Sequence, residues 1–121
     1  MEIIFSKPLS KTDVTHRLAI PSEKLDMIAT LSLGEKVSVA VIDATGRQWS
    51  FDLSTRNKGN YFKPVISGKQ WLEFVRLKHL REGDKITFYR ETIENNEVRF
   101  RIEKEFIGAS IVILGVPIRN S

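Results

Sequence analysis

Strict alternation of apolar residues on both sides of a glycine-containing turn is the feature that most constrains how this chain folds. Three valines alternate with other residues before the turn at 44–46, and three larger apolar residues do so after it: Val37, Val39, Val41, Trp49, Phe51 and Leu53. A period of two places one side of a strand against a core and the other side in solvent. The segment 36–53 is therefore predicted to be a β-hairpin whose two strands share one buried face.

Short strands separated by turn residues recur along the rest of the chain. Tight turns are predicted at 81–84 and, within the hairpin Ile93–Val98, at Asn95-Asn96. Further strands are predicted at 2–6, 61–66, 86–89 and 98–102, with a short apolar stretch at 18–20 and a last strand within 106–114. Many short strands of this kind are typical of a barrel or a sandwich, and strands with a single buried face argue against a parallel α/β sheet.

Two segments have helical periodicity instead. One opens at Pro21, with Ser22 as its expected N-cap, and the other lies within 69–80 with one apolar face. We therefore expect a mainly β fold, a partly open barrel of about seven strands with two short helices. Its core is expected to contain five aromatic residues: Trp49, Phe51, Trp71, Phe74 and Phe88.

Composition excludes several classes of protein. The 121 residues are enough for one domain, and we expect residues 1–121 to form a single one. The chain has no cysteine, which excludes disulfides, thiolate nucleophiles and cysteine-based zinc sites. The N-terminal stretch is too short and too acidic for a secretory signal, and no apolar run approaches the roughly 20 residues that span a bilayer. We expect a soluble, intracellular protein, or one domain of a longer one, without a membrane partner.

The residues needed for catalysis or metal binding are sparse. His16 and His79 are the only histidines, and neither has a carboxylate at ligand spacing. Neither a glycine-rich phosphate loop nor a nucleophile motif is present in the sequence. We therefore expect no enzymatic activity, no metal, no cofactor and no small-molecule substrate.

The charge of the chain is basic and unevenly distributed. The net charge is +4, and residues 1–90 have 15 lysines and arginines against 10 acids, whereas residues 91–121 have 4 against 5. A polyanionic partner would therefore bind within the first three quarters of the chain.

Two polar, basic segments lie in that part of the chain, at 7–17 and at 54–60. Arginine and asparagine side chains can read base edges in DNA, while lysine, serine and threonine side chains contact phosphates. Composition alone favours an ordinary solvated loop for each segment, with nucleic-acid binding as the alternative. The candidate DNA contacts are Lys7, Ser10, Lys11, Thr12, Thr15, His16, Arg17, Ser54, Thr55, Arg56, Asn57, Lys58, Asn60, Lys63 and Lys69.

Four motifs, in order, resemble a known family. The stretch 5–21 contains F-S-K-P-L-S-K-T-D-V and then R-L-A-I-P, and 43–51 reads D-A-T-G-R-Q-W-S-F. They are followed by W-L-E-F-V at 71–75 and by L-R-E-G-D-K-I-T-F at 80–88. Together they resemble the plant B3 DNA-binding domain over residues 5–90.

The resemblance implies a seven-stranded open β-pseudobarrel with two short helices that grips the major groove of double-stranded DNA with two arms. The first arm is Lys7–Arg17 and the second arm is Ser54–Asn60. It also implies a transcription regulator in the nucleus, with self-association or other transcription regulators as open partners. The first arm is shorter than is common in the family, and Arg56 replaces an aromatic residue in the second, so the preferred bases cannot be assigned by analogy.

Distinct roles are expected within the arms. Lysines and arginines neutralise phosphates: Lys7, Lys11, Arg17, Lys58, Lys63 and Lys69. Arg56 and Asn57 read base edges, with Thr55 and Asn60 as weaker candidates. Shorter polar contacts come from the first arm: Ser10, Thr12, Thr15 and His16.

Two rival functions remain open. A single-strand binder would stack bases on exposed aromatic residues, for which only Tyr61, Phe62 and Tyr89 are available. A protein-interaction barrel could instead use the apolar stretch 111–116 as an exposed sheet edge.

Overall fold

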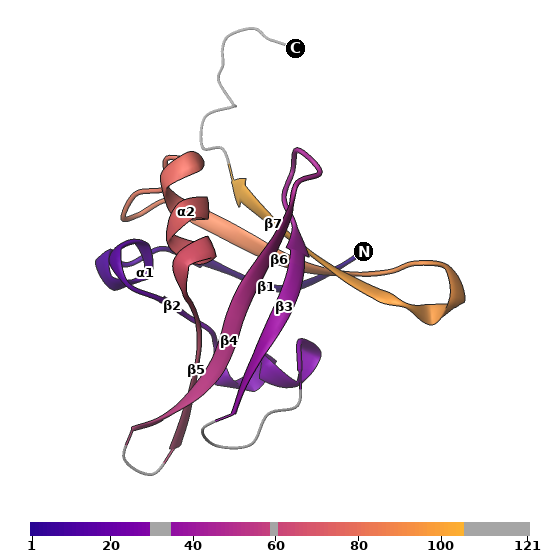
Figure 1. Ribbon diagram of the computed structural model, residues 1–121, viewed down its shortest axis with the longest axis horizontal. Coiled ribbons are helices and arrows are strands. Elements are labelled where there is room, and N and C mark those ends of the chain that lie inside the picture. Colours follow the sequence, from indigo (N-terminus) through magenta and orange to yellow (C-terminus); the bar gives the residue numbers. More distant parts are fainter. Residues whose placement is uncertain (30–34, 59–60, 106–121) are drawn as a thin grey trace, which may run out of the picture.

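The computed structural model describes residues 1–29, 35–58 and 61–105, with the backbone alone at 56–58 and 61–62. In this part of the chain seven strands form one sheet in the order β1-β6-β7-β3-β4-β5-β2 (Figure 1). Their bounds are β1 Glu2–Pro8, β2 Leu18–Ala19, β3 Lys36–Ile42, β4 Gln48–Lys58, β5 Tyr61–Ser67, β6 Lys85–Thr92 and β7 Val98–Glu105.

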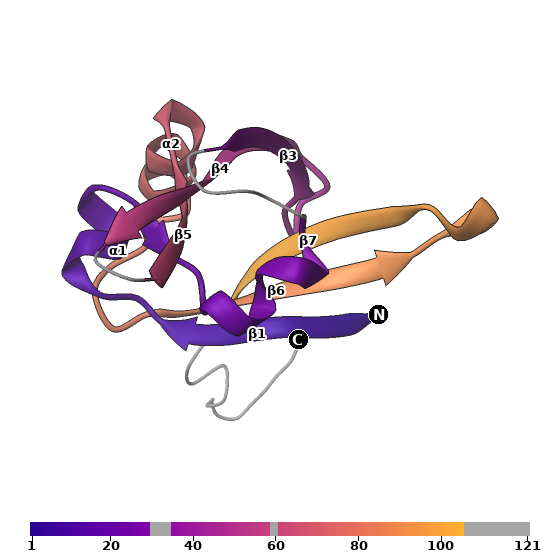
Figure 2. The same cartoon turned by 90° about the horizontal axis from the view of Figure 1, so that it is seen from below.

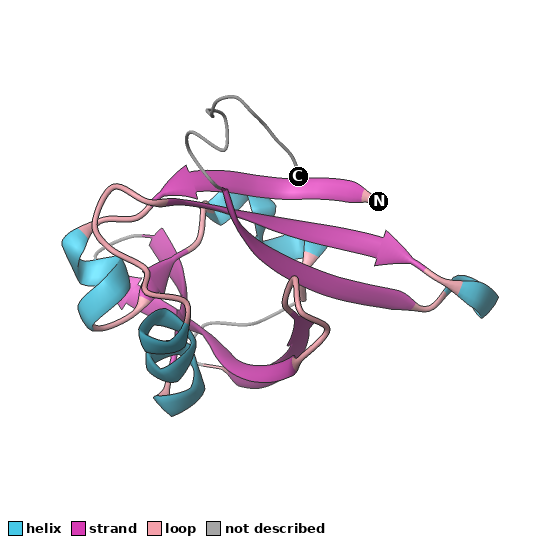
Figure 3. Ribbon diagram, turned by 90° about the horizontal axis from the view of Figure 1, so that it is seen from above, coloured by secondary structure: helices cyan, strands magenta, loops and turns pink. Residues whose placement is uncertain are grey.

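The sheet curls around a core without closing. Figures 2 and 3 show it wrapping most of the way round, with β1 and β2 as its two edges. Most neighbouring strands are antiparallel, and β3 pairs with β7 in parallel at Val41↔Phe100 and Ile42↔Arg101. The predicted mainly β, open pseudobarrel is therefore confirmed.

Aromatic residues fill the centre of this barrel, as the alternation predicted. All five expected core aromatics are at most 1% exposed. The ring of Phe51 meets that of Trp71 edge-on at 5.6 Å, and Trp49 meets Phe74 in the same way at 5.3 Å. Edge-to-face contacts of this kind add specific geometry to hydrophobic burial, so β4 and the second helix pack in one defined arrangement.

That second helix, α2 (Lys69–Leu77), buries Trp71, Phe74 and Val75 as predicted. The predicted helix near Pro21 is a 3₁₀ helix, η1 (Ser22–Met27), and the N-cap assignment of Ser22 was wrong. Pro21 occupies the cap position and no side chain caps the helix. None of the described helices is long and apolar enough to cross a bilayer.

The predicted turns are present. The amide of Asp84 donates to the carbonyl of Arg81 at 3.0 Å, and Asn95 and Asn96 both adopt positive φ in the 3₁₀ turn η2 (Glu94–Asn96) between β6 and β7. The last strand predicted within 106–114 lies outside the described residues. The seventh described strand is instead β2, where Leu18 and Ala19 pair with Ile66 and Val65 of β5.

Candidate nucleic-acid interface

The first arm contains a short helix rather than the turn-like segment that the sequence suggested. Residues Lys11–Thr15 form α1, whose N-cap is Ser10. The Asp13 amide donates to Ser10 Oγ at 3.1 Å, and the Ser10 amide donates to Asp13 Oδ2 at 2.8 Å. This reciprocal capping box satisfies amides that would otherwise lack a partner at the start of a helix, and so stabilises a helix of only five residues.

Asp13 also joins this helix to the rest of the barrel. Its side chain is almost fully buried and accepts a hydrogen bond from the Ala19 amide of β2 at 3.1 Å. The ammonium group of Lys7 lies 3.0 Å from Asp13 Oδ2 and also donates to the Ala19 carbonyl at 2.9 Å. The Trp71 indole donates to the Asp13 carbonyl at 2.8 Å. In the sequence Asp13 is only the one acid of a basic, polar segment, and nothing local indicates these long-range contacts.

The remaining candidates of the first arm lie on its outer surface. Lys11, Thr12, Thr15 and His16 are exposed, and Arg17 is partly buried. The Thr15 hydroxyl donates to the Lys11 carbonyl at 2.7 Å and lies 2.8 Å from His16 Nδ1. Since the single hydroxyl proton is used by Lys11, the Nδ1 atom of His16 is the donor in the second contact.

The second arm is part of a long hairpin, and the prediction of a loop was wrong over 54–58, while 59–60 lie outside the described residues. Strand β4 continues to Lys58 and β5 begins at Tyr61, with Arg56 opposite Lys63 and Asn57 opposite Phe62. A run of polar residues predicts a loop by composition, but a paired strand backbone accommodates polar side chains as well, as it does here at Ser54 and Lys63.

Within this hairpin the candidate side chains differ in accessibility. Lys63 is exposed and Ser54 partly buried, whereas Thr55 is only 4% exposed and points into the protein. Thr55 therefore does not present a group for base contact in this structure. Asn60 lies outside the described residues.

The sheet brings the two arms to one side of the molecule. β2, which follows α1, pairs with β5, and β5 is one strand of the second arm's hairpin. In Figures 1 and 2, α1 and the far ends of β4 and β5 lie on the same side of the barrel. Lys69 is exposed at the start of α2, which follows the end of β5 farther from the second arm, and α2 contacts α1.

Ion pairing separates the basic residues of the described chain into two groups. Several lie within 4 Å of a carboxylate: Lys7, Lys36, Arg47, Lys78, Lys85, Arg90, Arg99 and Lys104. Four candidates on the arms or beside them form no ion pair with any residue in the described ranges: Lys11, Arg17, Lys63 and Lys69. These four side chains therefore have no carboxylate partner among the described residues that would compete with an external anion.

Comparison with known proteins identifies the family. The family model of the B3 DNA binding domain matches residues 5–105.

This chain belongs to the B3 DNA binding domain family.

Relatives of this B3 domain are plant proteins. It is 25% identical, over 98% of its length, to the AP2/ERF and B3 domain-containing transcription repressor TEM1 of Arabidopsis thaliana, of which it covers 36%. It is 30% identical, over 81% of its length, to the B3 domain-containing transcription factor NGA4 of the same plant, of which it covers 29%. The chain thus spans about a third of the length of the curated relatives it matches.

The fold is also that of a protein solved in complex with DNA. The protein in the Arabidopsis FUS3–DNA complex superposes with a TM-score of 0.75 and 22% sequence identity, covering 86% of this chain and 97% of that one. The resemblance predicted from four short motifs over residues 5–90 is confirmed and extends to the end of β7.

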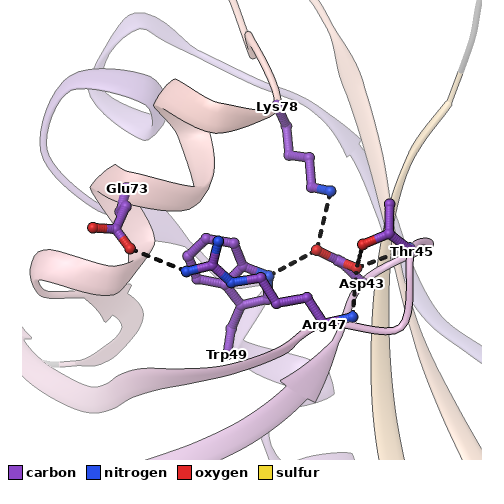
Figure 4. A network of polar contacts seen from close by, with 6 residues as sticks. All are labelled: Asp43, Thr45, Arg47, Trp49, Glu73 and Lys78. Carbon is purple, nitrogen blue, oxygen red and sulfur yellow. Dashed lines mark hydrogen bonds and ion pairs between the residues drawn. The ribbon is translucent and has the colours of Figure 1, made fainter.

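A second buried carboxylate stabilises the opposite end of β4 in this B3 domain. Asp43 accepts hydrogen bonds from the amide and hydroxyl of Thr45, the Arg47 amide and the Trp49 indole, and it pairs with Lys78 at 3.0 Å (Figure 4). Burial by itself would raise the pKa of Asp43, but the donors from Thr45, Trp49 and Lys78 outweigh it and hold the pKa well below its usual range.

This second network joins the β3–β4 turn to the C-terminal end of α2, away from the arms. Arg47 covers the Trp49 ring at 4.0 Å and pairs with Glu73 of α2 at 3.3 Å. The turn at 44–46 was predicted from the sequence, whereas the role of Asp43 was not. An acid between an apolar strand and a turn, followed by a tryptophan, is the pattern that could have indicated it.

Proposed function

We propose that this B3 domain binds double-stranded DNA sequence-specifically, as the DNA-binding module of a transcription regulator acting in the nucleus. The first and second arms enter the major groove, which is about 12 Å wide. Residues 1–121 act as one domain, and its role is to bind rather than to catalyse.

The observation that supports this most strongly is the β2–β5 pairing. The two basic segments are some 40 residues apart in the chain, yet this pairing joins their supporting strands and places both on one side of the barrel. Membership of the B3 DNA binding domain family and the four cations without an ion pair among the described residues agree with a polyanionic partner.

The arms divide the task of recognition between them. Lys11, Arg17, Lys63 and Lys69, with Lys58 of the second arm, neutralise phosphates and set the register. Shorter polar contacts come from four residues of the first arm, Ser10, Thr12, Thr15 and His16. Ser54 supplies one from the second arm.

Base reading is assigned to the end of β4. Arg56 and Asn57, with Asn60 as a weaker candidate, have the side chains that pair in bidentate fashion with guanine and adenine edges. Their backbone register is supported by pairing with Lys63 and Phe62 across the hairpin.

Selection from a random duplex library, followed by a salt series on the selected duplex, tests this function. Five phosphate contacts predict a slope of log K against log salt near −4.5, at about −0.9 for each phosphate, or roughly a 500-fold loss of affinity between 50 and 200 mM salt. Competition by single strands is the control, because a single-strand binder would prefer them. Binding that is insensitive to salt, or a failure to select any duplex, would refute the proposal.

Variants of the second arm separate base reading from phosphate contact. Arg56→Ala and Asn57→Ala are each expected to cost about 1–3 kcal/mol on the selected duplex and to relax its specificity. Lys58→Ala, the matched control, should weaken selected and random duplexes alike. Equal losses on both duplexes for Arg56→Ala and Asn57→Ala would contradict the base-reading role.

A further inference from the structure

We propose that Asp13 is a positioning residue that fixes the first arm for DNA reading, and that Lys7 serves as its partner rather than as a phosphate contact. This inference rests on the proposed DNA-binding function and deepens it. Asp13, a buried acid within a basic segment, thereby acquires a role in DNA binding. Lys7, which was expected to contact a phosphate, becomes part of the support of the first arm.

The contacts of Asp13 require a carboxylate. Three donors converge on its two oxygens: the Ser10 amide and the Lys7 ammonium on Oδ2, and the Ala19 amide on Oδ1. An asparagine would turn an N–H₂ group toward at least one of these donors, and one buried donor would lose its acceptor. The capping box, the link to β2 and the ion pair therefore depend on one side chain.

Asp13 also determines where the first arm lies. A helix as short as α1 has no stability of its own in water, so its position depends on its attachments. The Asp13 side chain joins α1 to β2, whereas its carbonyl accepts a hydrogen bond from Trp71, which is fully buried in α2. The exposed Lys11, Thr12, Thr15 and His16 side chains stand on or next to this helix, and their positions follow from its own.

Lys7 is held differently from the other lysines of the interface. Its side chain is only 23% exposed, and its ammonium group contacts both Asp13 and the Ala19 carbonyl. The charge of Lys7 is already compensated by Asp13 in the free protein, so it attracts few counterions that DNA could displace. Lys11, exposed and without an ion pair to another described residue, provides the contrast on the same arm.

The chain contains a matched control for Asp13. Asp43 is equally buried and pairs with a lysine at the same distance of 3.0 Å. Each acid also accepts from a tryptophan indole, Asp43 with its carboxylate and Asp13 with its backbone carbonyl. Asp43 lies beyond the Gln48 end of β4, whereas the second arm begins at Ser54, about 20 Å further along the strand at 3.3 Å per residue. The loss of a buried carboxylate within the first arm, at Asp13, can thus be compared with the same loss at Asp43, outside both arms.

The first experiment compares Asp13→Asn with Asp43→Asn, each at a temperature where urea titration shows it to be folded. Asp13→Asn is expected to lower affinity for the selected duplex by about ten-fold, the cost of one lost base contact, with affinity for a random duplex unchanged. Hydrogen exchange at the amides of Ser10 and Ala19 should become faster. In Asp43→Asn, the ratio of the affinity for the selected duplex to that for the random duplex should equal the wild-type ratio.

The second experiment uses variants that are milder for folding. Lys7→Met is expected to keep the wild-type salt slope, whereas Lys11→Met should make the slope shallower by about 0.9, as loss of one phosphate contact requires. Lys7→Met should also reduce the preference for the selected over the random duplex, because Asp13 loses its partner. Lys7→Arg, which preserves the ion pair, should keep that preference.

Four results would overturn the inference. The first is a change of the salt slope in Lys7→Met as large as in Lys11→Met. The second and third are an Asp13→Asn variant that loses affinity equally for the selected and the random duplex, or one that keeps the full wild-type specificity. The fourth is a loss of specificity in Asp43→Asn as large as in Asp13→Asn. A wild-type protein that selects no duplex is a separate outcome, which would refute the proposed function and this inference with it.

Discussion

Replacing Asp43 with alanine should cost this B3 domain a large part of its stability. The substitution removes the acceptor for hydrogen bonds from Thr45, Arg47 and Trp49 and the counter-ion of Lys78. Because Asp43 is 1% exposed, water does not readily replace it.

The size of the loss follows from the partners that remain. Breaking a buried ion pair by removing one member costs about 3–5 kcal/mol, and a buried indole left without an acceptor adds about 1–3 kcal/mol. The Lys78 side chain is 26% exposed and recovers part of its hydration. We therefore expect a loss of about 4 kcal/mol, out of the roughly 5–15 kcal/mol typical of a domain.

Urea unfolding at pH 7 measures this loss as a lower midpoint at an unchanged m-value. A double-mutant cycle with Lys78→Met isolates the ion pair, and we expect a coupling of about 2 kcal/mol because the double variant no longer leaves an ammonium group without a partner. A loss below about 1 kcal/mol for Asp43→Ala, or a cycle without coupling, would refute the argument that this carboxylate holds the β3–β4 turn to α2.

Three further predictions concern stability. The pKa of Asp43 is lower in the folded than in the unfolded chain, so its contribution is complete above the ordinary carboxylate range and decreases as the pH falls below about 4; urea midpoints from pH 7 to 2 should decline less steeply in Asp43→Asn. Gly68→Ala should destabilise by about 1–3 kcal/mol, since Gly68 has φ +99° and an added Cβ would lie 2.6 Å from Asp52 Oδ2; an unchanged melting temperature would contradict this. Phe51→Ala should cost about 3–5 kcal/mol by calorimetry, because the ring is fully buried, and a loss typical of a surface site would show that the core is assembled differently.

Local patterns predicted the elements whose physics is local. Alternation at Trp49 and Phe51 identified a strand and its buried face, because side chains two apart in a strand necessarily share a side. Polar composition was a poorer guide. It could not distinguish a solvated loop from the paired backbone of β4 and β5, and it counted Thr55 with the exposed Lys63 among the candidate contacts, although Thr55 is buried.

The two buried acids, Asp13 and Asp43, have contacts that the sequence alone does not predict. Ser10 and Asp13 have the spacing of a capping box, which a local search could have found. The contacts of Asp13 with Lys7, Ala19 and Trp71 depend on where three other elements lie, and the same holds for Asp43 and Lys78. A carboxylate's burial, and therefore its partners, is a property of the packed molecule.

The sequence by itself determined that this chain forms an aromatic-filled open β-barrel of the B3 family, and it identified the two basic segments. These conclusions depend on the spacing of residues close together in the chain, which the sequence gives directly. Only the tertiary structure decided that β2 pairs with β5, which places both arms on one side, and that Lys7 is compensated by Asp13 while Lys11 is not. The physical reason is that pairing and charge compensation are set by distances across the fold, between residues far apart in the chain.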